Sequence, residues 1–202
     1  MAENKIREPI QKRSIEKKEK ILKVGFDLIC EKGYYNVSTP DIAKAAGVST
    51  GIVYSYFKDK KDIFVEGIKK YSNSIFFPML DILTITSVKK NNLKAVLKQL
   101  INVFIENHTL SSSAHEEILA MSHTDKEVAQ FFIDFEIEIT EQIVKILKNN
   151  NFKTKHLTEK VHISMGLVEN LCHEIVFHKH SNINESAMKN EVIDIIINLL
   201  KE

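Results

Sequence analysis

Apolar residues recur every three or four positions through most of this chain, which is the spacing of amphipathic helices rather than of strands. No segment keeps the alternating pattern of a strand, and no internal repeat is visible in the sequence. A first helix is expected over Ser14–Lys32, ended by Gly33. Its apolar positions are Ile21, Leu22, Phe26, Leu28 and Ile29. The pattern predicts an all-α protein of about nine helices.

Two short helices joined by a tight turn are predicted next. Ser38 can cap the first of them, with Asp41 completing a capping box. Gly47 permits a sharp turn, and Ser49 is placed to cap the second helix over Thr50–Phe57. This order is the helix-turn-helix of proteins that place their second helix in the major groove of DNA.

The rest of the chain is predicted to be long helices with short polar links. A fourth helix opens at residues 58–62, and Pro78 is expected to kink or end it. Beyond Pro78 the chain has one glycine, Gly166, and no proline. The expected later segments are Leu93–Asn107, Ser113–Ser122, Asp125–Asn149, Thr154–His180 and Glu185–Lys201.

The formal net charge of +1 conceals an uneven distribution. Residues 1–70 carry 15 Lys and Arg against 10 Asp and Glu, whereas residues 71–202 carry 13 against 17. A basic first part and a slightly acidic second part suit a module that binds nucleic acid joined to one that does not.

Two further features indicate a cytoplasmic protein. Cys30 and Cys172 lie far apart on apolar helical stretches, as expected of buried free thiols in a reducing compartment. The chain starts with polar residues rather than a secretory signal. The stretch Tyr71–Val88 contains Pro78 and Asp81, so a membrane span is not expected there.

The order of parts resembles the tetracycline-repressor (TetR) family of bacterial regulators. The resemblance covers about residues 17–64 and rests on Ile21-Leu22, Leu28-Ile29, Lys32-Gly33-Tyr34, Asp41 to Ser49, Gly51, Tyr54, Tyr56-Phe57 and Lys60. It implies a three-helix DNA-binding domain, a larger helical effector and dimerisation domain, and repression released by a small ligand. We therefore expect a basic arm over residues 1–13, a DNA-binding domain over 14–60, and a ligand-binding and dimerisation domain over 61–202, connected by the fourth helix.

The second short helix has the chemistry of a DNA-reading surface. Thr50 and Gly51 at its amino end are small enough for close approach, and the positive helix end favours phosphate. Ile52 is apolar on an outward face, which contact with thymine methyl groups would explain. The Tyr54 hydroxyl can reach sugar and phosphate. The expected DNA contacts are Ser38, Thr39, Ser49, Thr50, Gly51, Ile52, Tyr54, Ser55, Tyr56 and Lys60. For Tyr56 the alternative is burial against the first helix.

Phosphate binding is expected to depend on few charges. Lys60 and Thr39 are placed to hold phosphates on either side of the groove, whereas Thr50 and Pro40 stand where the family often has basic or polar residues. Affinity should then depend on Lys60, the arm and backbone amides. Lys60→Ala should weaken binding to all sequences alike and lower the salt slope by about one, whereas changing Ile52 or Thr50 should alter sequence preference.

The last two helices are apolar on more than one side, which predicts packing against their own core and against a partner chain. A twofold dimer through a four-helix bundle follows, as the resemblance also implies. Two reading heads would then meet an approximately palindromic operator. The interface candidates are Val161, Val168, Cys172, Ile175, Met188, Val192, Ile195, Ile196 and Leu199.

Aromatic residues mark a candidate pocket for a small, partly apolar effector, with ordinary core packing as the alternative for each of them. The apolar candidates are Phe76, Phe77, Phe131, Phe132, Phe135 and Met165. The polar candidates that would orient a ligand are Glu138, Glu169 and His173. A ligand beside the fourth helix would shift the reading heads out of register.

All eight histidines fall in the second part, at 108, 115, 123, 156, 162, 173, 178 and 180, which raises metal sensing as an alternative. Cys172-His173 and His178-x-His180 lack the spacing of a helical zinc pair, so no metal or cofactor is expected. The sequence offers no phosphate loop, nucleophile elbow or catalytic triad, so we do not expect an enzyme. An activator or a partner-regulated DNA-binding protein remains the alternative to a repressor.

Overall fold

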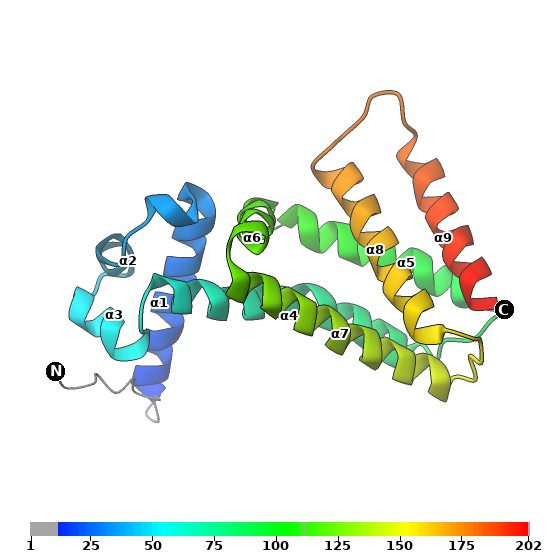
Figure 1. The fold of residues 1–202 in the computed structure, drawn as a ribbon, viewed down its shortest axis with the longest axis horizontal. Coiled ribbons are helices and arrows are strands. Elements are labelled where there is room, and N and C mark those ends of the chain that lie inside the picture. Colours follow the sequence, from blue (N-terminus) through cyan, green and yellow to red (C-terminus); the bar gives the residue numbers. More distant parts are fainter. Residues whose placement is uncertain (1–11, 111, 202) are drawn as a thin grey trace. The chain divides into compact units, whose positions relative to one another are not determined.

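The computed structural model describes residues 12–110 and 112–201, and these residues form helices without any strand (Figure 1). The elements are α1 (Lys12–Lys32), η1 (Tyr34–Asn36), α2 (Thr39–Ala46), α3 (Thr50–Tyr56), α4 (Lys60–Ile85), α5 (Leu93–Leu110), α6 (Ser112–Thr124), α7 (Lys126–Asn149), α8 (Leu157–Val176) and α9 (Glu185–Lys201). The prediction of an all-α fold is confirmed for this part of the chain. Among the helices described, none combines the length and apolar character needed to cross a membrane.

The chain divides into two compact units that do not follow the sequence order. The first unit comprises residues 1–72 and 113–129, and the second comprises 73–112 and 130–202. The expected domains of residues 14–60 and 61–202 differ from these units, because the first part of α4 and residues 113–129 join the first unit. Most of the predicted basic arm lies outside the described residues, and Lys12 and Arg13 form the exposed start of α1.

The first unit is built on an apolar core in which α1 packs on α2 and α2 packs on α3. Two glycines in this core allow helices to approach closely. A Cβ atom on Gly67 of α4 would lie 2.2 Å from Cδ2 of Phe26, and one on Gly25 of α1 would lie 2.9 Å from Cγ2 of Ile63. The fully buried core residues include Ile21, Ile42, Val53, Phe57, Ile63, Phe64 and Ile68.

Local capping determines both ends of α2. The Asp41 carboxylate accepts a hydrogen bond from the Ser38 N–H at 2.9 Å, and the Asp41 N–H donates to the Ser38 hydroxyl at 3.4 Å. Gly47 takes the left-handed conformation, with φ of 70°, and ends the helix. The capping box and the glycine turn are therefore confirmed. Ser49 occupies the cap position of α3, but its hydroxyl makes no capping hydrogen bond, so that part of the prediction is wrong.

Pro78 does not end α4, which continues to Ile85. Proline removes one hydrogen bond from a helix, but packing can offset this loss. Leu80 and Leu83, which follow Pro78, are buried in the second unit and hold the helix together there. Helix α8 is shorter than the expected segment Thr154–His180: His156 adopts a left-handed conformation just before it, and the helix ends at Val176.

The core of the second unit lies between α5, α8 and α9, with the end of α4 and the second half of α7 added to it. Helices α8 and α9 pack side by side, as the orange and red ribbons of Figure 1 show. The buried residues of this core include Leu83, Leu97, Ile101, Val144, Leu147, Phe152, Leu171, Ile193 and Leu200. The three- and four-residue periods of the sequence correspond to these inward faces.

Candidate nucleic-acid interface and effector region

Helix α3 presents one apolar face inward and one mixed face outward. Val53 and Phe57, at i and i+4, are fully buried. On the other side Tyr54 is 41% exposed, Gly51 is exposed, and Ile52 is partly exposed. A Cβ atom on Gly51 would meet nothing within 4 Å, so the amino end of the helix is open to a large partner.

An open groove of about 480 Å³ lies beside this outward face. It brings together the segment before α2, the first residues of α2, Tyr54 of α3 and the start of α4. The Asp59 carboxylate in the groove accepts the N–H of Asp62, so it caps the start of α4. The lining residues are Tyr35, Asn36, Val37, Ser38, Thr39, Pro40, Tyr54, Asp59 and Lys60.

Lys60 is engaged by the protein itself. Its Nζ donates to the carbonyl oxygens of Tyr34, at 2.5 Å, and Val37, at 2.8 Å. The ammonium also lies 4.3 Å from the centre of the Tyr34 ring. Two of its three N–H groups therefore fix the segment that leads into α2. The sequence predicted a charge here but not these two partners.

Three residues expected to contact DNA are less accessible than predicted. Tyr56 is 8% exposed, and its hydroxyl lies 2.8 Å from the Ser14 hydroxyl of α1. The alternative of burial against the first helix is therefore the arrangement found, and a DNA contact by Tyr56 does not fit it. The Ser55 hydroxyl donates to the Ile52 carbonyl at 2.7 Å, and Thr39 is 7% exposed although it lines the groove.

Residues 113–129, although distant in the sequence, form hydrogen bonds and ion pairs with residues next to the helix-turn-helix. Glu117 of α6 accepts the N–H of Tyr34 at 2.5 Å. The Lys61 ammonium pairs with Asp125 at 2.8 Å and with Glu127 at 3.0 Å. The hydrogen bonds that Lys61 donates to these two carboxylates raise its pKa, and the bond from Lys61 lowers the pKa of Asp125. The sequence gave no signal for these pairs, because each joins residues more than sixty positions apart.

Only some of the aromatic residues predicted to bind an effector pack together. Phe76, Phe131 and Met165 pack against a buried group formed by Leu80, Phe135 and Ile139. The ring centres of Phe76 and Phe135 are 5.2 Å apart, and those of Phe131 and Phe135 are 5.7 Å apart. These residues form an aromatic cluster in the second unit.

The remaining candidates of this region are placed differently. Phe132 lies at the edge of the cluster, with its ring centre 5.5 Å from that of Phe131. Phe77 is 48% exposed and lies outside the cluster, and exposed Glu138 accepts from Gln142 at 3.1 Å. Because the side chains of Phe77 and Glu138 both face outward, their positions do not support the ligand-binding role expected of them.

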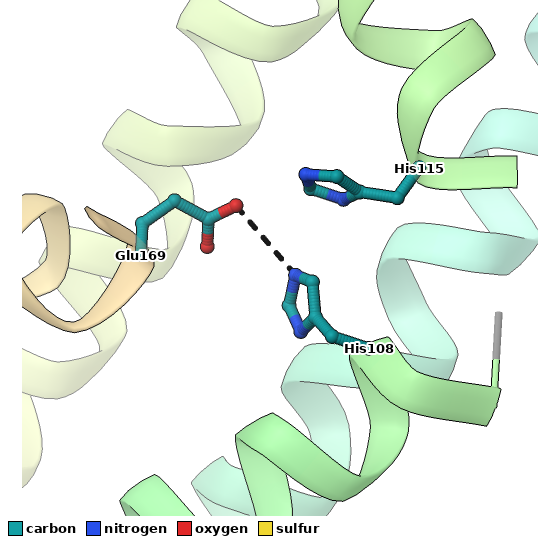
Figure 2. A group of neighbouring side chains, drawn as sticks. All are labelled: His108, His115 and Glu169. Carbon is teal, nitrogen blue, oxygen red and sulfur yellow. Dashed lines mark ion pairs between the residues drawn. The ribbon is translucent and has the colours of Figure 1, made fainter. Parts of the chain in front are cut away.

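The polar candidates Glu169 and His173 lie in the same unit as His108, which was not among the predicted ligand-binding residues. Oε1 of Glu169 lies 3.5 Å from Nε2 of His173 and 3.6 Å from Nε2 of His108. Figure 2 shows the second of these pairs, formed across α8 and α5. The sequence named His108 only as one of eight histidines, because its partner Glu169 lies 61 residues away on another helix.

Several dimer candidates are buried within their own chain. Val161, Cys172, Ile175 and Ile196 are at most 6% exposed in the second unit, so their own chain covers these four side chains. An apolar stripe on a helix covers its own core before it can meet another chain. The other candidates, Val168, Met188, Val192, Ile195 and Leu199, keep some exposure, and Ile195 is 44% exposed.

The sequence predicted more than one apolar side on α8, but the interface candidates did not include Ile163. Ile163 is 54% exposed on this helix, and Leu167 is partly exposed one turn further on. Between them a Cβ atom on Gly166 would meet nothing within 4 Å. In the sequence, an isoleucine three residues before a mid-helix glycine is the signal that could have located this face.

A capped α2, a glycine turn and an α3 with an open amino end define a helix-turn-helix DNA-binding protein. Residues 21–66 match the family model described as bacterial regulatory proteins, tetR family. These residues are therefore a DNA-binding domain of the TetR family, and over most of its length the chain is similar to transcriptional regulators.

Three comparisons show how this likeness extends along the chain. The fatty acid metabolism regulator protein of Bacillus subtilis is 26% identical over 161 residues, covering 78% of this chain and 76% of that protein. The transcriptional regulator AcrR of Shigella flexneri is 45% identical over 51 residues, which are 25% of this chain and 24% of AcrR. A crystal structure from Mesorhizobium loti, assigned to the same family, has a TM-score of 0.72 at 20% identity and covers 94% of this chain and 98% of its own. The relatives are regulators rather than enzymes.

Proposed function

We propose that this protein is a cytoplasmic repressor that binds a palindromic operator as a dimer and leaves it when a small, partly apolar effector binds. The observation that carries the proposal is the outward face of α3. There Gly51 and Ile52 are accessible while Val53 and Phe57 anchor the helix from behind. An anchored helix with an open amino end is what entry into the major groove requires.

Base reading is assigned to the exposed residues of α3. Thr50 can hydrogen-bond a base edge, and the Ile52 side chain can contact a thymine methyl group. Gly51 allows the backbone to come close, and Tyr54 can reach the sugar-phosphate backbone. Ser49 precedes them at the amino end of α3.

Phosphate binding is assigned to the groove beside α3. Its wall contains the amino end of α2, where the helix dipole favours an anion. Ser38 and Thr39 stand at this end, and the third N–H of Lys60 adds a charged donor. The groove is thus suited to one phosphate beside the bases that α3 reads.

Selection of bound sites from random DNA, with the full-length protein, tests this proposal. Inverted half-sites should be enriched, and Ile52→Ala or Thr50→Ala should change the preferred base at one position in each half-site. Lys69→Ala, which removes an exposed charge of α4, is the control and should leave the preferred sequence unchanged. Enrichment of no sequence, or of the same sequence by the parent and both α3 variants, would contradict the assignment.

The dimer is proposed to form through the outer faces of α8 and α9. Ile163 and Ile195 are exposed on these helices, and Gly166 would let a partner helix approach closely. Ile195→Asp should yield a monomer in sedimentation analysis. Ile85→Asp makes the same change at a residue that is 83% exposed on α4, and it should leave the dimer intact. A dimeric Ile195→Asp protein would exclude this interface.

The effector is proposed to contact the aromatic cluster of the second unit. The Bacillus subtilis relative is named for fatty acid metabolism, which supports a ligand with an extended apolar part. Fatty acids of graded chain length are therefore the first probes, with operator affinity and melting temperature as readouts. Binding that lowers operator affinity supports a repressor, and Phe131→Ala should weaken it. An increase of operator affinity would instead identify a regulator that the ligand activates.

A further inference from the structure

The reading helix α3 carries no charge of its own. Its residues, Thr50–Tyr56, include no acidic or basic side chain. In the groove beside it, two of the three N–H groups of Lys60 already bond carbonyl oxygens, and the Asp59 carboxylate offsets the charge of this lysine. DNA binding depends strongly on cations that neutralise phosphates. A head that binds DNA is therefore expected to have a positive group outside α3 and the groove.

Lys20 of α1 places such a group beside the turn of the helix-turn-helix. A Cβ atom built on Gly47 would lie 3.8 Å from Nζ of Lys20. Helices α1 and α2 pack together, which holds Lys20 next to this turn. Gly47 has φ of 70° and no side chain, so the ammonium can come close to the backbone there. Because α3 begins three residues further on, at Thr50, the Cα atoms of Gly47 and Thr50 are at most about 11 Å apart.

The Lys20 ammonium makes no hydrogen bond or ion pair with any residue that the structure describes, and its side chain is exposed. Two neighbouring lysines of α1 differ in this respect. Lys18 pairs with Glu66 at 3.0 Å, and Lys23 pairs with Asp27 at 2.6 Å. The partial negative charge at the carboxyl end of α2 favours an ammonium nearby but takes up none of its N–H groups. Lys20 is therefore placed to donate to an anion that approaches the turn.

Lys20 and the groove lie at the two ends of α2. The groove includes Ser38 and Thr39 at the amino end of this helix, and Lys20 lies at Gly47, where the helix ends. The 8 residues of α2 make a helix about 12 Å long. The major groove of B-DNA is also about 12 Å wide. Anchors at both ends of α2 thus match the spacing of the phosphates that border a major groove.

We propose that the Lys20 ammonium of each reading head binds a DNA phosphate beside the turn, at the other end of α2 from the groove. The inference rests on the proposed function, because it takes the amino end of α3 to face the DNA. The competing role for Lys20 is to stabilise the carboxyl end of α2 through the helix dipole. The two roles differ in one measurable respect, since only a phosphate contact releases counterions from the DNA.

The test is the salt dependence of DNA binding by the full-length protein. Mixed-sequence duplex DNA is the probe, because a phosphate contact requires no particular base sequence. Lys20→Gln should weaken binding and make the slope of log K against log salt concentration less negative by about 0.9 for each reading head. Lys20→Arg, which keeps the positive charge, should keep the parental slope.

Lys69→Gln is the matched control. Lys69 is an exposed residue of α4 that also lacks a hydrogen bond or ion pair with the described residues. It lies nine residues, or about 14 Å, along the helix from Lys60. Removing the same charge there should leave the slope unchanged, and urea unfolding compares the stability of all the variants.

The outcomes separate this inference from the proposed function. The inference alone is overturned if the parent binds DNA and Lys20→Gln keeps the parental slope, whatever its stability, or if Lys69→Gln changes the slope as much as Lys20→Gln does. A parent that binds mixed-sequence DNA through Lys20 but selects no preferred sequence would contradict the proposed function and support the phosphate contact. A parent that binds no DNA would overturn both.

Discussion

The substitution Gly67→Ala measures how closely α1 and α4 pack in the reading head. The added Cβ would lie 2.2 Å from Cδ2, 2.5 Å from Cγ and 2.9 Å from Cβ of Phe26. Carbon atoms in favourable contact are about 3.5–4.0 Å apart. Because Cβ and Cγ lie close to the backbone, a small turn of the ring does not relieve the clash. Either Phe26 changes rotamer or the two helices separate.

The expected change in the free energy of unfolding follows from the contacts that Phe26 would lose. Its ring centre lies 5.9 Å from that of Phe64 and 6.4 Å from that of Tyr71, and aromatic pairs contribute about 0.5–1.5 kcal/mol each. Displacing the ring also exposes part of a side chain whose full burial is worth about 1.5–3 kcal/mol. Alanine regains about 1 kcal/mol through helix propensity. The expected net loss in the free energy of unfolding is about 1–3 kcal/mol.

Urea unfolding followed by circular dichroism, at one fixed protein concentration, measures this loss. The melting temperature should fall by about 2–4 °C for each kcal/mol. Gly51→Ala is the matched control, because its Cβ meets nothing within 4 Å and its stability should equal or exceed that of the parent. A Gly67→Ala protein as stable as the parent would refute the close approach of the two helices.

Three further predictions concern single groups. Lys60→Met, which keeps the aliphatic stem, should lower the free energy of unfolding by about 1–3 kcal/mol, because the ammonium bonds two carbonyl oxygens; unchanged stability in urea would contradict this role. Hydrogen bonds from the Ser38 side chain and backbone lower the pKa of Asp41, so their stabilisation is complete above the ordinary carboxyl pKa and is lost as the pH falls through the lowered value. Asp41→Asn should therefore flatten the stability profile below about pH 4, and a variant that keeps the parental profile would assign this acid sensitivity to other groups. Burial raises the pKa of Cys30 and of Cys172 to about 12. An aromatic disulfide reagent should therefore react with the folded protein at least about 100-fold more slowly than with the unfolded chain. Comparable rates would show that the thiols are accessible.

Interactions between near neighbours were predictable from the sequence. Ser38, Asp41 and Gly47 determine the ends of α2 through contacts that reach three or four residues along the chain. Val53 and Phe57 were expected to face the core because they are four residues apart on a short helix, and both are fully buried. The family likeness follows from the same local pattern, since the family model matches residues 21–66.

Interactions between distant residues were not predictable in this way. The periodicity of α8 identifies apolar faces but does not say which protein surface covers them, so Cys172 was assigned to a partner although its own chain buries it. The bond between Glu117 and the Tyr34 N–H, and the pair of His108 with Glu169, depend on which helices the fold brings together. A glutamate and a histidine on separate helices have no pattern in common along the sequence.

The discontinuous first unit affects how chimeric regulators should be constructed from this protein. A fusion that cuts the chain after residue 72 would omit Glu117 and Asp125, which bond Tyr34 and Lys61. A foreign sensor grafted at that point would leave the N–H of Tyr34 and the ammonium of Lys61 without these partners. The transplantable part is therefore residues 1–72 together with 113–129, and a working biosensor should exchange only what lies outside both segments.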